Sequence, residues 1–183
     1  MTKVFVGGSR AVSRLNSRVK ERLDNIMKQD FMVLVGDANG ADRAVQRYLA
    51  GRRYSNVLVY SMDVCRNNLG DWSTRRHKAE SSTMRDRRYY GVKDLAMAQD
   101  ANCGFMLWDG KSKGTLTNVV NLLNAQKKVL LYLSPKKLFF TLRTLDDLPE
   151  TLHASGVNDV ARFLSALQVR QPLSPGLPSI QLG

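Results

Sequence analysis

The sequence predicts an α/β protein in which helices cover both faces of a parallel sheet. Three times in the first 115 residues, a short apolar segment runs into a turn of glycine and small polar residues and then into a helical pattern. The apolar segment 31–35 is short and unbroken, as expected of a strand that is covered on both faces. Strands and helices that alternate in this way imply right-handed crossovers and one parallel sheet.

Short apolar segments mark the predicted strands. These strands lie at residues 3–6, 31–35, 56–61, 104–108, 129–133 and 138–142. The last of them follows Pro135, where the pattern changes, and it forms part of a short C-terminal strand and helix appendage.

Between the strands, apolar residues recur at the spacing of an amphipathic helix. Ser13 is the predicted N-cap of the first helix, and the second helix starts after Gly40 and ends at Gly51. Further helices are predicted at 79–99, with a local break near Gly91, and at 115–126 and 157–167. An acidic linker is predicted at 146–150.

The chain has the length of one full domain, at 183 residues. We expect residues 1–134 to form a nucleotide-binding domain, 135–170 to be an appendage of the same domain, and 171–183 to be a flexible tail. The tail contains Pro172, Pro175 and Pro178 with little apolar surface to bury.

The composition is that of an ordinary globular protein, with 43% hydrophobic and 24% charged residues. Cys65 and Cys103 are far apart and lack metal-ligand spacing, so we expect neither a disulfide framework nor a metal site. No cofactor is predicted. No export signal or long apolar stretch is recognisable, and we expect a cytoplasmic location without a membrane partner.

The net charge of +12 favours an anionic partner but does not choose between nucleotides, nucleic acid and acidic surfaces. Basic residues are densest in segment 66–88, between the second and third glycine turns. This segment could equally be the solvated face of a long helix. Its position beside the turns is the argument for a binding role.

The three turns are expected to lie at one edge of the sheet, where free backbone N–H groups and helix N-termini favour anions. The predicted ligand and phosphate-binding residues are Gly7, Gly8, Ser9, Arg10, Gly36, Asp37, Gly40, Arg85, Arg88, Gly110, Lys113, Gly114 and Thr115. Asp37 could hydrogen-bond a ribose hydroxyl, whereas Asp42, in the first turn of a helix, is interpreted as structural. The dinucleotide and P-loop glycine signatures do not occur.

In their order and spacing, these motifs resemble the SLOG superfamily. The landmarks are Gly7-Gly8-Ser9-Arg10, Gly36-Asp37-Ala38-Asn39-Gly40-Ala41-Asp42, Arg85-Asp86-Arg87-Arg88 and Asp109-Gly110-Lys111-Ser112-Lys113-Gly114-Thr115. The superfamily includes the LOG enzymes and the DNA-processing protein DprA, and the arginine-rich motif is most similar to that of its YspA-like bacterial branch. The resemblance spans residues 3–133 and implies a Rossmann-like sheet that binds a nucleotide or nucleotide derivative.

The resemblance also implies which residues would bind the ligand and which would be catalytic. Arg85, with Arg88 as its nearest substitute, would be the phosphate or substrate arginine. LOG enzymes hydrolyse the N-glycosidic bond of nucleoside monophosphates with paired glutamates, and Thr117 and Asn118 occupy those places here. Because neither side chain supplies a carboxylate, the catalytic residues are unknown. The weak alternatives are Asp37, Asp42 and Asp109.

Three functions follow from these observations. The first is a nucleotide-binding module that serves as a sensor. The second is a LOG-like hydrolase of a nucleotide derivative, and the third is DprA-like binding of nucleic acid, ranked below the other two. The resemblance also implies a homodimer or larger homo-oligomer.

Overall fold

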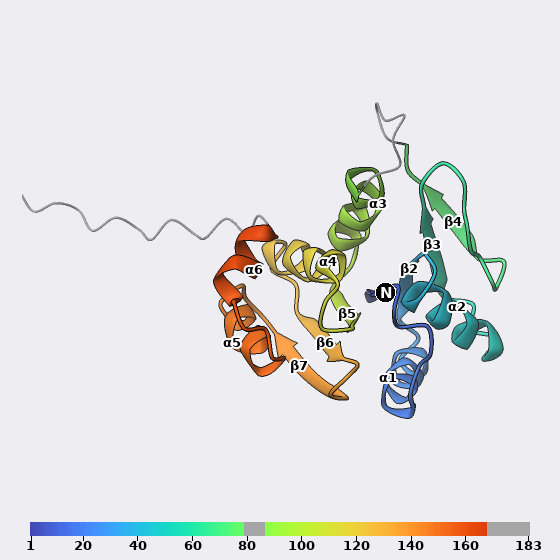
Figure 1. Cartoon of the computed structure of the whole chain (residues 1–183). Helices are drawn as coiled ribbons and strands as arrows, with labels where there is room; N and C mark the ends of the chain where they lie inside the picture. Colours follow the sequence, from blue (N-terminus) through green and yellow to red (C-terminus); the bar gives the residue numbers. More distant parts are fainter. Residues whose placement is uncertain (79–86, 168–183) are drawn as a thin grey trace, which may run out of the picture.

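The computed structural model describes residues 1–78 and 87–167, which form one seven-stranded sheet with helices on both faces (Figure 1). The strands are β1 (Lys3–Gly8), β2 (Met32–Gly36), β3 (Val57–Ser61), β4 (Ser73–Arg76), β5 (Cys103–Trp108), β6 (Val129–Leu133) and β7 (Leu138–Leu142). The helices are α1 (Ser17–Lys28), α2 (Ala41–Gly51), α3 (Arg87–Asp100), α4 (Lys113–Asn124), α5 (Asp147–Ala154) and α6 (Val160–Ala166). The predicted Rossmann-like α/β class is confirmed.

The strand order places β1 at the centre of the sheet. The order is β4-β3-β2-β1-β5-β6-β7, with every pair parallel except β6 and β7. From β1 the chain moves outward through β2, β3 and β4 and then returns to the other side of β1 as β5. The carboxyl ends of β1 and β5 therefore lie at the point where the direction of winding reverses. In open α/β sheets this is where ligands bind.

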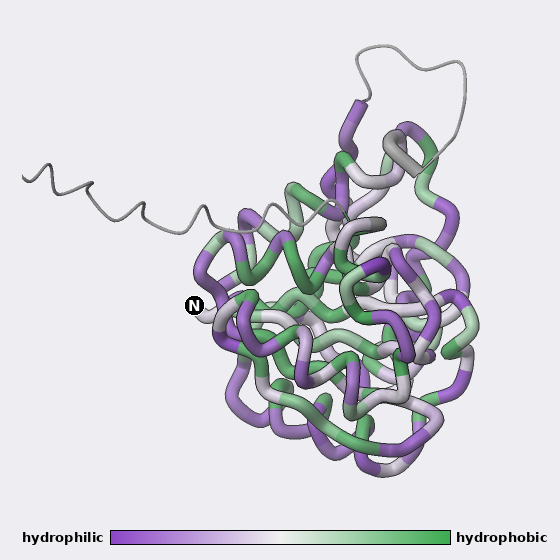
Figure 2. The backbone as a smooth tube through the Cα atoms, turned by 60° about the vertical axis from the view of Figure 1, so that its left-hand side comes forward, coloured by the Kyte–Doolittle hydropathy of each residue, from purple (hydrophilic) through white to green (hydrophobic). Residues whose placement is uncertain are grey.

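Side chains alternate between two cores on the two faces of the sheet. Val4 and Val6 of β1 pack in a cluster with α1 and α2, whereas Phe5 between them packs in a cluster with α3 and α4. Apolar segments of the tube run through the interior and hydrophilic ones lie at its periphery (Figure 2). Residues of α5 and α6 join the second cluster beside β7. Such two-sided burial explains the unbroken apolar strands.

Strand β4 was not predicted, because its sequence carries no apolar alternation. It is a polar edge strand that pairs only with β3, through Leu58↔Ser73 to Ser61↔Arg76. Trp72, just before it, anchors the segment by donating its indole N–H to the Tyr54 carbonyl at 2.8 Å. A strand whose side chains are largely exposed leaves little signal in the sequence.

Two sequence predictions, a helix cap and a linker, are corrected by the structure. Helix α1 is capped by Asn16, whose side chain accepts from the Val19 N–H at 3.0 Å, and not by Ser13. The predicted acidic linker at 146–150 is largely helix α5. A carboxylate oxygen of Asp147 accepts from two preceding backbone N–H groups, and Leu148 is fully buried on the inner face of the helix.

Other boundaries differ by a few residues. Of the helix predicted at 79–99, the part at 79–86 lies outside the described residues, and Gly91 lies inside α3 without ending it. Helix α6 begins at Val160 rather than at residue 157. The tail predicted at 171–183 also lies outside the described residues. None of the described helices is both long and apolar enough to cross a membrane.

Candidate functional site

The three glycine turns meet at the carboxyl edge of the central strands. The strand register pairs Gly8 of β1 with Leu107 of β5 and Val6 with Val35 of β2, so the turns start at similar heights. The Ser9 N–H donates to the Leu107 carbonyl at 2.9 Å, and the Ser9 carbonyl accepts from the Ala41 N–H at 3.1 Å. The first turn is therefore joined by its backbone to the end of β5 and to the start of α2.

Gly8 of the first turn and Gly40 of the second lie directly against backbone atoms of neighbouring segments. A Cβ atom added to Gly8 would lie 2.2 Å from the Leu107 carbonyl oxygen, and one added to Gly40 would lie 2.3 Å from the Arg10 Cα atom. Gly40 also has φ +85°, a conformation that disfavours side chains. Glycine is required at both positions because the neighbouring backbone segments lie too close for a side chain.

Beneath the first two turns lies a buried ionic cluster. Lys93 of α3 is only 3% exposed and places its Nζ 2.7 Å from the Asp94 carboxylate and 3.9 Å from Asp37. Gly36 makes this approach possible, because an added Cβ would lie 2.9 Å from Lys93 Nζ and 2.3 Å from an Asp42 oxygen. Gly7 borders the same cluster, with Asp42 Oδ1 3.5 Å from the position of its absent Cβ.

The pKa values of both Asp42 and Lys93 are raised in this cluster, for different reasons. Burial raises the pKa of Asp42 to about 6, although the Lys93 ammonium and the Ala38 N–H act against this rise. Burial alone would lower the pKa of Lys93, but the Asp94, Asp42 and Asp37 carboxylates raise it overall. Lys93 therefore stays charged at neutral pH, whereas the Asp42 carboxyl ionises close to neutrality.

Asp37 is held by Arg66 from the connection that follows β3. The Arg66 Nε and Nη2 atoms donate to the two carboxylate oxygens at 3.0 and 2.7 Å, and the Arg66 backbone N–H donates at 3.1 Å. Burial alone would raise the pKa of Asp37, but these hydrogen bonds and the charge of Lys93 lower it overall. The carboxylate predicted to meet a ribose thus has both oxygens engaged by Arg66.

The Tyr90 ring of α3 lies close to the guanidinium groups of two arginines. The Arg66 guanidinium lies 4.6 Å from the centre of the Tyr90 ring, and that of Arg10 lies 5.9 Å from it. The Arg10 side chain is exposed and has no salt bridge within residues 1–78 and 87–167. Two cations from two different connections therefore converge on one aromatic ring at the carboxyl edge.

The third turn, after β5, is more open. Gly110 has φ +83°, and the nearest atom to an added Cβ is a Leu133 methyl carbon at 3.6 Å. Gly114 has nothing nearer than the Ser112 hydroxyl at 4.0 Å, and Lys113 is exposed. Thr115, by contrast, is buried, and both its N–H and its hydroxyl contact the Ser112 hydroxyl, at 3.3 and 3.0 Å.

Asp109 holds the third turn in place through hydrogen bonds to its backbone. Its Oδ1 accepts from the N–H groups of Ser112 and Lys111 at 2.7 and 3.0 Å, and the Ser9 hydroxyl bonds the same carboxylate. Burial alone would raise the pKa of Asp109, but these hydrogen bonds lower it overall. Ser9 is itself buried, so its hydroxyl links the first turn to the third.

The residues in place of the LOG glutamates lie on α4. The Thr117 hydroxyl donates back to the Lys113 carbonyl at 3.0 Å on its own helix. Asn118 is buried, and its amide donates to the Asp94 carboxylate at 3.5 Å. The Asn118 amide therefore contacts a carboxylate that comes from α3.

Two of the predicted site residues are not placed in full. Arg85 lies outside the described residues, and the structure describes the backbone of Arg88 in α3 but not its side chain. Sequence reasoning missed Lys93 and Asp94. Their spacing in α3 carries no motif, and only the fold shows that this lysine is buried beside three carboxylates.

Comparison with known proteins supports the fold assignment. No family model matches the sequence, and no curated protein matches it. A solved chain of DNA processing protein A from Helicobacter pylori, described as binding single-stranded DNA in a unique mode, is similar with a TM-score of 0.54 and 16% identity. The alignment covers 91% of this chain and 80% of that one. At this identity the likeness establishes a shared fold.

Proposed function

We propose that the chain binds a nucleotide or a nucleotide-derived phosphate ligand at the carboxyl edge of β1 and β5. The observation that carries this proposal is the exposed Arg10 guanidinium, which has no salt bridge among the described residues and belongs to the turn that Ser9 links to the open third turn. That turn adds the exposed Lys113 and the start of α4, where backbone N–H groups favour an anion.

The surrounding structure supports a preorganised site. The backbone of Arg10 is fixed because its turn packs directly against Gly40. Tyr90 offers an aromatic surface between the arginines, and bases bind such surfaces by stacking. Arg66 is held by Asp37 and contributes positive charge without needing to be ordered on binding.

The test removes the Arg10 side chain alone. A hydrogen bond to a charged group is worth about 1.5 to 3 kcal/mol, so Arg10→Ala should bind nucleoside monophosphates about 10- to 100-fold more weakly. Lys128→Ala is the matched control, since Lys128 is exposed before β6, at the opposite edge of the sheet. Arg66→Ala is unsuitable because it would leave the buried Asp37 without its guanidinium partner.

Isothermal titration calorimetry with adenosine, guanosine, cytidine and uridine monophosphates measures the effect. Equal affinities of folded Arg10→Ala and Lys128→Ala proteins for every nucleotide that binds would contradict the proposal, as would no binding by the unmodified chain. Release of ribose 5-phosphate during the titration would instead favour the LOG-like hydrolase. Binding without turnover fits a sensor.

Binding of single-stranded nucleic acid is the second candidate. The exposed Arg76 and Lys78, at and just after the end of β4, extend the positive charge of the edge beyond the turns. The similarity to the single-stranded DNA-binding protein also favours it. Fluorescence anisotropy with labelled oligothymidylate at several salt concentrations tests it, because phosphate contacts give an affinity that falls steeply with salt. Tight mononucleotide binding with no oligonucleotide binding would exclude it.

A further inference from the structure

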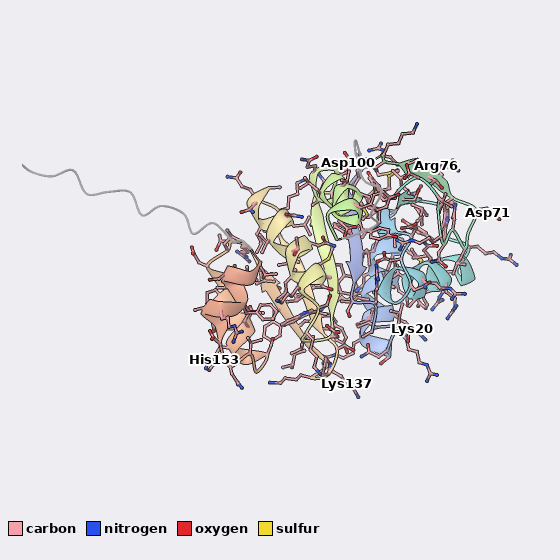
Figure 3. All side chains as sticks on the ribbon, turned by 45° about the horizontal axis from the view of Figure 1, so that its top comes forward. Lys20, Asp71, Arg76, Asp100, Lys137 and His153 are labelled. Atoms are coloured by element: carbon pink, nitrogen blue, oxygen red, sulfur yellow. The ribbon has the colours of Figure 1, made fainter. Side chains whose placement is uncertain are left out.

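A cavity of about 510 Å³ lies between helices α1 and α2. These two helices cover the sheet face opposite α3 and α4 (Figure 1). Lys20, at its rim, lies on this side of the molecule, away from Arg76 and Asp100 (Figure 3). Such a volume is within the range of small-molecule sites. The lining residues are Ser13, Arg14, Leu15, Lys20, Ala44, Arg47, Tyr48, Gly51 and Arg52. We call this cavity the α1–α2 cavity.

The lining of the α1–α2 cavity contains four cations and no carboxylate. Across residues 1–78 and 87–167, Arg14, Lys20 and Arg47 form no salt bridge. Of the four, Arg52 alone has an acidic partner among the described residues, Asp24 at 3.5 Å. These exposed cations, gathered around one cavity, create a positive potential that favours an anion.

Tyr48 provides the scaffold around which the cations gather. Its hydroxyl donates to Asp24 at 2.7 Å and accepts from the Arg52 guanidinium at 2.9 Å. The Lys20 ammonium lies 5.8 Å from the ring centre, and the Arg52 guanidinium lies 5.3 Å from it. With the partly buried Leu15 and the buried Ala44, the Tyr48 ring gives the cavity an apolar patch beneath a cationic rim.

The cavity is distinct from the carboxyl edge of the sheet. Arg47 and Arg52 belong to the last part of α2 and the residue that follows it, far along the helix from Gly40 and its turn. Arg14 follows Arg10 on the connection between β1 and α1, but Arg10 does not line the cavity. A ligand in the cavity would therefore contact a different set of cations.

We propose that the α1–α2 cavity is a second anion site that binds a small organic polyphosphate of nucleotide size. Three cations that form no salt bridge among the described residues carry more charge than one phosphate monoester, at about −2, which favours a ligand with at least two linked phosphates. Its non-phosphate part packs on the apolar patch of Leu15, Ala44 and Tyr48. A nucleoside triphosphate satisfies both requirements.

Isothermal titration calorimetry with inorganic tripolyphosphate and with ATP tests this proposal. In the Arg10→Glu background, which weakens the edge site, both probes should bind with a stoichiometry of one. ATP should bind more tightly than tripolyphosphate because only ATP has a part that reaches the apolar patch.

Adding Arg47→Glu to that background should weaken binding of both probes about 10- to 100-fold. Adding Lys128→Glu instead makes the same change in net charge and should alter affinity less than about threefold, since distant exposed charges are screened. Arg47 is exposed on α2, so the variant should stay folded, and circular dichroism checks this. Lys20→Glu is the second variant, with the same expected loss.

Several outcomes would overturn the proposal. Equal weakening by Arg47→Glu and Lys128→Glu would show only nonspecific attraction to a basic protein. Failure of either probe to bind, or Arg47-dependent binding of oligonucleotides alone, would rule out a small polyphosphate. The edge site is tested separately, because loss of mononucleotide binding in Arg10→Ala with normal polyphosphate binding concerns only that site.

Discussion

The turn after β1 and the turn after β5 have similar compositions but different physical roles. In the first, Gly8 faces the Leu107 carbonyl and is matched by Gly40 from the second turn, which faces the Arg10 backbone. In the third, no backbone atom of another described segment lies within 4 Å of the Cβ position of Gly110 or Gly114. Glycine in the first two turns therefore serves packing, whereas in the third it leaves an open surface beside Lys113.

The carboxylates beside the closed and the open turns differ in the direction in which their pKa is shifted. Asp42 is buried below the closed turns, where burial raises its pKa to about 6. Asp109 also meets a burial penalty, but the N–H groups of its own turn lower its pKa overall. A glycine-rich turn can thus hold a neighbouring carboxylate in either state, because the single Ala38 N–H does not offset the burial of Asp42, whereas the N–H groups of Lys111 and Ser112 help to offset that of Asp109.

The largest expected effect is that of closing the space at Gly40. Gly40→Ala introduces a clash with Arg10 and places a side chain at φ +85° and ψ −126°. Strained backbone and overpacking each cost about 1 to 3 kcal/mol, so we expect a loss of about 3 to 5 kcal/mol. Urea unfolding measures it. Gly51→Ala at the other end of α2, where an added Cβ meets nothing within 4 Å, should change stability by less than about 1 kcal/mol; equal losses would show that the closed packing is not what the glycine serves.

The buried Asp42 should make stability depend on pH. Its folded pKa of about 6 lies above the ordinary value of 3.8, so between these values the native state binds more protons than the unfolded state. Its contribution to stability is therefore fully present below pH 3.8 and is lost as the pH rises toward 6. Relative to wild type, Asp42→Asn should gain up to about 3 kcal/mol between pH 4 and pH 7.

Urea unfolding of wild type and Asp42→Asn at pH 4, 5, 6 and 7 measures this difference directly. Asp109→Asn is the matched control from the open turn. Its folded pKa is lowered, so wild-type Asp109 stabilises the protein at neutral pH and loses this contribution as the pH falls. Because pH 4 to 7 lies above the ordinary pKa of 3.8, the difference between Asp109→Asn and wild type should change little over this range, while that of Asp42→Asn grows with pH. Parallel pH profiles would show that the environments of the two carboxylates do not differ as described.

A smaller effect is expected at the helix cap of the open turn. Ser112 caps α4 by accepting from the Thr115 N–H, so Ser112→Ala should cost about 1 kcal/mol. Ser13→Ala is the control, because Ser13 has the sequence of a cap but Asn16 performs that role. Thermal unfolding of both variants checks the prediction, which fails if Ser13→Ala is the more damaging change.

The smallest effect should be a gain. Gly114 lies in the first turn of α4 with open space around it, and alanine lowers the entropy of the unfolded chain. Gly114→Ala should stabilise the protein by about 0.5 kcal/mol, in contrast to the large loss at Gly40. A destabilised variant would mean that the third turn is as closely packed as the first.

The alternation of strands and helices could be predicted from the sequence because it is encoded locally. Unbroken apolar segments such as those in β2 and β5 identify strands buried on both faces, and helical spacing identifies the crossovers. Local pattern was insufficient where side chains carry no apolar alternation, as in β4, and where two polar residues compete for one cap, as at Ser13 and Asn16.

The sequence by itself determined the parallel sheet, its order of elements and the three turns that follow β1, β2 and β5. Tertiary structure alone decided which side chains meet at those turns, because the contacts join residues far apart in the chain. Arg66 reaches Asp37 from 29 positions away, and Lys93 enters their cluster from α3. The burial of Lys93 and the raised pKa of Asp42 depend on how the elements pack, and no local spacing of residues encodes either property.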